Sequence, residues 1–479
     1  MTRSTSSTAD LSGRTQRPAR RRGTWVAAAC LLTVWIAYFT ALQWSVVRYR
    51  LAIVLVLTTA AVLLAAALAR RQRPPEVPPV LLAAALLGCA VVAELVPFFS
   101  YTTPGERRLL AHVVAAGCVL SAAALLLLDR HHPAGAGRAL AAGTAVLTFV
   151  VSSAAAIVLD PAPRIDVWVT LQQAADGLSH GQNMYTMTWT GSPGIQDAFT
   201  YLPWTAVLSA PGRWLVGDVR WALLVLGIAA VACTAALGRG TGPARPGRTS
   251  AGALTAVTLL ALAPGSITQA EQAWTEPMLL AALACWALLV RRGHPWWAVL
   301  PLAVGCASKQ HLAVLLPVLA CWQAYGLRRV LATGGLTGLL VLPWFAADPA
   351  AMWHDTVSLL VGFHPIRFAN TLYLAAQHEL DWTPPFWLTG LAIVGTLAAV
   401  CIVVRRRQPD LAELLGWLAL LLLVATLVNK QGFYNQYWLV AGLVALGLAA
   451  GGSGVTPGPA VGSETLVHER LPRQDPVQP

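Results

Sequence analysis

The chain has 479 residues, of which 56% are hydrophobic and only 11% are charged. Soluble domains usually carry roughly 25% charged residues, so this composition and the repeated apolar runs exclude a string of soluble domains and indicate a polytopic membrane protein. The net charge of +12 does not indicate a nucleic-acid partner, because the arginine clusters lie at the ends of apolar runs, where they mark cytoplasmic ends.

Four segments follow in chain order. Residues 1–23 form a Ser/Thr/Arg-rich tail that we expect to be disordered and cytoplasmic, and residues 24–138 hold the N-terminal transmembrane helices. Residues 139–450 form the main membrane domain, and residues 451–479 form a second disordered cytoplasmic tail. The predicted fold is an all-α, polytopic transmembrane helical bundle of about 13–15 spans, with amphipathic juxtamembrane helices in its outer loops.

A long polar interruption at residues 160–204 stands out among the apolar runs. Within it, one group of apolar residues recurs at helical spacing: Ile165, Trp168, Leu171, Ala175 and Leu178. Asp166, Thr170 and Gln173 fall on the opposite side of the same predicted helix. We therefore expect an amphipathic helix beside the bilayer, with the Asp166 carboxylate on its wet face. The alternative for Asp166 is an ordinary solvated loop acid.

Arginine placement puts this interruption outside the cell. Residues 199–214 are apolar but short and contain two prolines, whereas residues 219–237 form a convincing span before a basic loop at 239–250. If both segments crossed, every later arginine cluster would lie on the wrong side. We therefore expect residues 199–214 to be re-entrant or only partly inserted.

Most of the other polar residues away from the basic turns fall on the same outer side. They include Glu271, Glu276, Lys309, His364, Arg367 and Lys430. Ionisable groups near hydrocarbon are costly unless they are paired or solvated, so their convergence suggests a shared site. Lys309 is an isolated cation in a turn, which suits a phosphate partner, and its alternative role is snorkelling to the headgroups. Glu276 begins a helix and could simply face the helix dipole.

The order of several short motifs resembles the GT-C membrane glycosyltransferases. These motifs are an Asp-containing outer loop ending in GLSHGQNMY, then FTYLP, then EQAWTEPMLL, then ASKQHLAVLLP, and finally NKQGFYNQYW. The similarity covers residues 139–450, which we therefore expect to form a GT-C-like glycosyltransferase domain. It is greatest to the polyprenyl-phosphate-mannose-dependent mannosyltransferases of glycosyltransferase family 87. Two differences are the extra N-terminal spans, whose role stays open, and a single Asp in place of a pair.

The resemblance implies a hexosyltransferase of cell envelope biosynthesis, located in the cell membrane with its active site on the outer face. It would transfer a sugar, with mannose expected, from a polyprenyl-phosphate donor to a lipid or glycan acceptor, with inversion and with Asp166 as the base. Lys309, His364 and Arg367 are the candidates for donor phosphate binding. The candidates for substrate binding are Tyr185, Tyr201, Glu271, Glu276 and Lys430.

We expect no cofactor and no metal. The eight cysteines show no ligand spacing, and a polyprenyl phosphate leaves already charged, so a base and a cation suffice. A transporter or flippase for a lipid-linked sugar is the alternative function, but it would need deep charges and a repeat. A structural membrane subunit without activity is a third possibility.

Overall fold

The structure, a computed structural model, describes residues 12–131, 135–239 and 249–451. Helices and connecting loops make up these ranges, and no named β-strand occurs in them. The prediction of an all-α fold is therefore confirmed. Residues 1–11 of the first predicted tail and 452–479 of the second lie outside the described residues. Helix α1 begins at Ser12, within the first predicted tail.

Eight helices in the described ranges are long and apolar enough to cross a membrane, which confirms a multi-pass membrane protein. They are α1 (Ser12–Ser45), α2 (Leu51–Ala69), α4 (Pro104–His131), α5 (Ala136–Leu159), α8 (Arg220–Leu237), α14 (Gly326–Ala347), α18 (Phe386–Arg407) and α19 (Leu411–Val428). The shorter helices of the bundle are α3 (Pro79–Leu95), α9 (Ala251–Ala261), α11 (Glu276–Arg291), α12 (Val299–Ser308), η2 (Gln310–Leu315) with α13 (Leu316–Cys321), and the 18-residue α20 (Tyr434–Gly451). The predicted 13–15 crossings are reached only if these shorter helices also cross.

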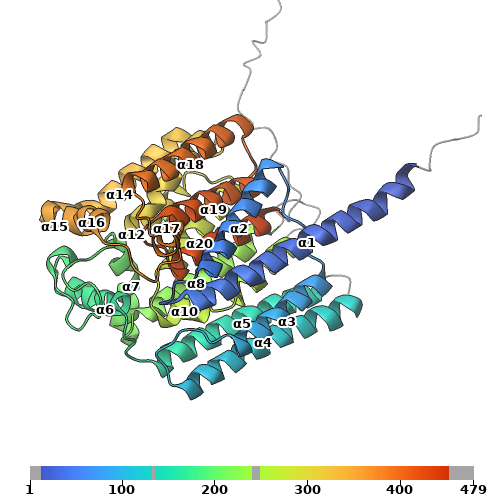
Figure 1. Cartoon of the computed structure of the whole chain (residues 1–479), viewed down its shortest axis with the longest axis horizontal. Coiled ribbons are helices and arrows are strands. Elements are labelled where there is room, and N and C mark those ends of the chain that lie inside the picture. Colours follow the sequence, from blue (N-terminus) through green and yellow to red (C-terminus); the bar gives the residue numbers. More distant parts are fainter. Residues whose placement is uncertain (1–11, 132–134, 240–248, 452–479) are drawn as a thin grey trace, which may run out of the picture.

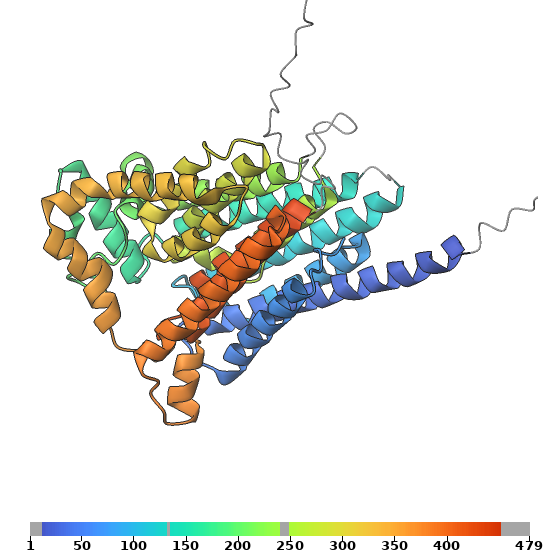
Figure 2. The ribbon, with the colours of Figure 1, turned by 90° about the horizontal axis from the view of Figure 1, so that it is seen from above.

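The remaining helices are short, and several of them lie at one end of the bundle, which we call the site end (Figure 1). They are α6 (Asp166–Ser179), η1 (Met184–Thr186), α7 (Trp204–Val216), α10 (Ile267–Glu271), α15 (Pro349–Trp353), η3 (His354–Ser358), α16 (Leu359–Gly362) and α17 (Leu372–Glu379). Figure 1 shows α6, α15 and α16 at the left, opposite the N-terminal part of α1. In Figure 2, α14 (gold) runs to this same end.

Helix α7 stays at the site end. It has 13 residues with Pro211 inside it. The Thr205 hydroxyl in its first turn donates to the Ser308 carbonyl at the end of α12 at 2.5 Å. In its last turn, Arg213 binds the Asp176 carboxylate of α6 at 2.7 Å. Both ends of α7 are thus tied to neighbouring segments, to the end of α12 and to α6. That residues 199–214 are re-entrant or only partly inserted remains a prediction.

Helix α6 forms where the apolar periodicity predicted it, but its surroundings differ from the expected membrane surface. Leu171 and Ala175 are fully buried in a cluster formed with α7 and the loop that follows α6. Thr170, expected on the wet face, is also buried. The Gln173 side chain bonds both the amide and the carbonyl of Thr190, so the loop folds back over this face. Protein therefore covers α6 on two sides.

Candidate active site

The Asp166 carboxyl group lies at the first turn of α6. Ile165 before it is extended, and Asp166 Oδ1 accepts a hydrogen bond from the amide of Val167 at 2.8 Å. A Cβ atom on Gly194 would lie 2.6 Å from Asp166 Oδ2, so the loop passes directly over this oxygen. Burial raises the pKa of Asp166, although backbone hydrogen bonds lower it. A carboxylate in this setting is a stronger base than one in water.

The salt bridges of the site end join other acids. Arg213 pairs with Asp176, and Arg220 pairs with Asp218. Lys309 pairs with Glu276. Asp166, whose carboxylate is half-buried beside Gly194, forms no ion pair in the described part of the chain. It can therefore accept a proton without first breaking a salt bridge.

Lys309 lies in the break between α12 and η2, where the backbone is extended. Its Nζ atom donates to Glu276 Oε1 at 2.5 Å and to Thr275 Oγ1 at 3.1 Å. Glu276 is fully buried at the start of α11, and the Lys309 side chain is 12% exposed. The isolated cation of the sequence thus has a partner 33 residues away. Any phosphate that binds Lys309 would share it with this carboxylate.

Tyr201 contacts this ion pair through the ammonium of Lys309. Its ring centroid is 5.2 Å from Lys309 Nζ. Burial raises the pKa of its phenol well above the ordinary value, and the negative charges of Asp166 and Glu276 raise it further. The phenol is therefore neutral at physiological pH, and its ring lies beside the candidate cation, Lys309.

The loop that carries Tyr201 is held from three directions. The amide of Leu202 donates to the Ser308 carbonyl at 3.1 Å. The hydroxyl of Tyr185, itself buried, donates to the Tyr201 carbonyl at 2.9 Å. The amide of Phe199 donates to Asp355 Oδ2 at 2.8 Å. Tyr185, predicted to bind substrate, therefore contributes to the site by positioning Tyr201.

A second acidic group lies where α10 meets the loop between α3 and α4. Glu271 at the end of α10 accepts hydrogen bonds from the amide of Tyr101 at 2.8 Å and from Ser100 Oγ at 3.3 Å. Burial and the neighbouring Asp160 carboxyl raise the pKa of Glu271 to about 7, against the lowering effect of bonds from Tyr101 and Gln272. Glu271 thus has a buried acid as its neighbour, and it anchors a loop of the N-terminal helices.

Arg220 fixes the position of these segments. It is fully buried at the start of α8, binds the Asp218 carboxylate at 2.6 Å and donates to the Asp160 carbonyl, also at 2.6 Å. Its Nη1 atom lies 3.4 Å from the Glu271 carbonyl. A buried charge of this kind is costly unless every donor has a partner. Its role is to join the end of α5, the start of α8 and α10.

His364, Arg367 and Lys430 lie in a different place from Lys309. His364 and Arg367 are exposed on the loop after α16, and the His364 ring stacks on Phe363. Lys430 is buried, and its Nζ atom donates to the carbonyl of Val361 in α16 at 2.6 Å. In the described residues, no hydrogen bond or ion pair joins these cations to Lys309, and their part in phosphate binding remains a prediction.

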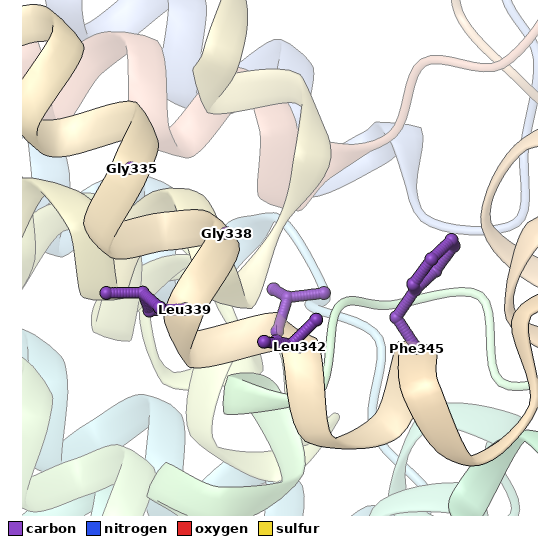
Figure 3. A pocket seen from close by; sticks show the side chains of 6 residues that line it. Gly335, Gly338, Leu339, Leu342 and Phe345 are labelled. Atoms are coloured by element: carbon purple, nitrogen blue, oxygen red, sulfur yellow. The ribbon is translucent and has the colours of Figure 1, made fainter.

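Two further features bear on what the site can hold. The residues that the structure describes contain no group of three or more His, Cys, Asp or Glu side chains able to hold a metal ion. An apolar groove of about 430 Å³ lies along α14, not at the polar cluster. Figure 3 shows the side chains of Leu339, Leu342 and Phe345 beside it, with two glycines that leave the hollow open. The groove has almost no polar lining and so carries no catalytic group.

Comparisons with known proteins give a likeness of fold. No family model matches the chain, and no curated protein matches it. ArnT from Cupriavidus metallidurans bound to undecaprenyl phosphate is similar, with 16% sequence identity over 66% of this chain and 60% of that chain, at a TM-score of 0.42. The apo state of the same protein gives 17% identity over 65% and 59%, at a TM-score of 0.41. The chain thus matches about 60% of the length of the ArnT structures, and neither match concerns family 87 or mannose.

Sequence reasoning missed two parts of the site. Tyr101 belongs to a loop of the N-terminal helices, which the resemblance leaves unexplained, and nothing local marks it. Asp218 directly precedes the span predicted over residues 219–237, and Arg220 lies at its start. The sequence does contain a signal for this ion pair. Two opposite charges lie two residues apart at the start of a span and outside any arginine cluster, and such charges are rarely tolerated near hydrocarbon without a partner.

Proposed function

We propose that this protein is a GT-C-type hexosyltransferase that moves a sugar from a polyprenyl-phosphate donor to a lipid or glycan acceptor at the outer face of the cell membrane. Mannose is the first sugar to test, because the sequence motifs resemble family 87. One observation carries the proposal: Asp166 is a half-buried carboxylate with no ion pair in the described residues, and its charge raises the pKa of Tyr201, whose ring lies 5.2 Å from the Lys309 ammonium. One ArnT structure holds undecaprenyl phosphate, a lipid of the class proposed here as donor.

The chemistry needs a base on one side of the reacting carbon and a cation on the other. Asp166 takes the proton of the acceptor hydroxyl while the hydroxyl oxygen bonds to the anomeric carbon. The bond from that carbon to the phosphate oxygen breaks, and the electron pair leaves with the polyprenyl phosphate. A single displacement of this kind inverts the anomeric centre. Lys309 would stabilise the charge on the departing phosphate, and sharing it with Glu276 would moderate how tightly the product is held.

The test is transfer from radiolabelled polyprenyl-phosphate sugars in membranes that contain the protein. Asp166→Asn keeps the shape of the side chain but cannot take the proton, so turnover should fall by about 10²-fold to 10⁴-fold. Asp197→Asn is a matched control, because Asp197 is an exposed acid of the neighbouring loop, and its turnover should stay near wild type. If Asp166→Asn kept more than about a tenth of the activity, far above that range, the assignment of the base would be wrong.

A further inference from the structure

The loop between α3 and α4 brings two aromatic rings to the site from the N-terminal helices. Phe99 and Tyr101 lie in this loop with their ring centroids 5.1 Å apart and their planes at 83°. Both rings are partly exposed. The guanidinium of Arg164, two residues before the proposed base, lies 5.8 Å from the Tyr101 ring centroid. Two rings at a right angle and a cation thus lie together, and the cation comes from the segment that leads into α6.

The loop is fixed in position by contacts on both sides of these rings. Phe98 is buried against α4, α5 and α10. The Ser100 hydroxyl and the Tyr101 amide bond Glu271 Oε1, and the hydroxyl groups of Ser100 and Thr102 lie 2.7 Å apart. The loop is therefore already ordered in the folded protein, so a ligand that binds to it would not bear the entropy cost of ordering the loop. A fixed loop that leaves two aromatic rings partly exposed is suited to binding a ligand.

Tyr101 and Tyr201 have different charged neighbours. Arg164 lies 5.8 Å from the Tyr101 ring centroid, whereas Lys309 lies 5.2 Å from the Tyr201 ring centroid. The charge of Asp166 raises the pKa of both phenols. Asp166 is thus the acid that both tyrosines share. Lys309 lies on the Tyr201 side, where the donor phosphate is proposed to bind. The acceptor, whose hydroxyl group gives its proton to Asp166, would then bind on the Tyr101 side.

We infer that Phe99, Tyr101 and Arg164 form a subsite for a sugar ring of the acceptor, so that the acceptor is a glycan or carries one. This inference rests on the proposed function. The ring C–H groups of a sugar form an apolar face that packs on an aromatic ring, while its hydroxyl groups need polar partners at the edge. Arg164 has no ion pair in the described part of the chain and presents donors for such hydroxyls. The N-terminal helices thereby gain a role in acceptor recognition.

The experiment measures sugar binding without any donor. The protein is placed in lipid nanodiscs, because maltoside detergents carry a sugar, and saturation-transfer NMR is recorded with mannobiose, maltose and cellobiose. Wild type should transfer saturation to the ring protons of at least one disaccharide. Tyr101→Ala should weaken this binding by roughly tenfold, the effect of losing one aromatic contact. Tyr101→Phe keeps the ring and should bind within about twofold of wild type.

Two control variants identify the source of any effect. Trp382→Ala removes an exposed aromatic from another loop and should leave binding unchanged. Asp166→Asn should bind the disaccharide but not transfer. Binding that is absent in wild type, or equal in wild type and Tyr101→Ala, would overturn the subsite even if donor-dependent transfer occurs. Loss of transfer from every donor, with Tyr101-dependent binding intact, would instead count against the proposed function.

Discussion

The pair of Lys309 and Glu276 makes a quantitative prediction about stability. The two side chains meet at 2.5 Å, with Glu276 fully buried and Lys309 only 12% exposed. Lys309→Gln would leave a buried carboxylate without its cation and with Asn435 and His311 as its polar neighbours. Breaking a buried pair from one side costs about 3–5 kcal/mol. Exposed pairs cost only about 0–1 kcal/mol. Lys309→Gln and Glu276→Gln should each destabilise the protein by the larger amount.

The double variant separates a lost interaction from a lost side chain. With both charges removed, no unpaired buried charge remains, so Lys309→Gln/Glu276→Gln should be more stable than either single variant. Equilibrium SDS titration in mixed micelles gives the unfolding free energies that a double-mutant cycle needs. Single variants that cost less than about 1 kcal/mol, as an exposed pair would, would refute the reasoning.

The same two residues also lead to a prediction about the apparent KM for the donor. If Lys309 also contacts the donor phosphate, Lys309→Gln should raise the apparent donor KM by one to two orders of magnitude, since charge-assisted bonds are worth roughly 1.5–3 kcal/mol. Glu276→Gln leaves the ammonium in place without its partner, so it should bind donor at least as tightly as wild type. Equal donor KM values in wild type and Lys309→Gln would confine this lysine to a structural role.

Three further predictions concern other parts of the site end. The pKa of Glu271 is raised in the folded state from about 4.5 to about 7, so its contribution to stability is present below about pH 4.5 and is lost as the pH rises toward 7; Glu271→Gln should flatten this decline in thermal unfolding curves recorded across that range. Gly194→Ala would place a Cβ atom 2.6 Å from the proposed base and should lower transfer more than tenfold, as misplacement of a catalytic group does, whereas Gly105→Ala, in open space, should not. In a cysteine-free background, Asp197→Cys should react with an impermeant thiol reagent in intact cells and Arg292→Cys should not; the reverse pattern would invert the proposed orientation.

Local patterns in the sequence were enough to predict the helical fold, helix α6 and the polar interruption around Asp166. Apolar runs of bilayer length predicted an all-α membrane bundle, because no water is available there to satisfy an open backbone. The apolar residues of α6 predicted that helix, and the two prolines together with the arginine bias predicted that α7 would not cross. The polar interruption around Asp166 was visible for the same reason, since charge is unusual in such a chain.

Which polar side chains contact one another depends on the tertiary structure. Lys309 and Glu276 are 33 residues apart, and Tyr101 and Glu271 are 170 residues apart. No local pattern encodes such distances, because they depend on how the helices pack and where their ends converge. Burial decided the chemistry in the same way: Asp166 was expected on a wet face, but the loop at Gly194 covers it, and the desolvation of its charge raises its pKa.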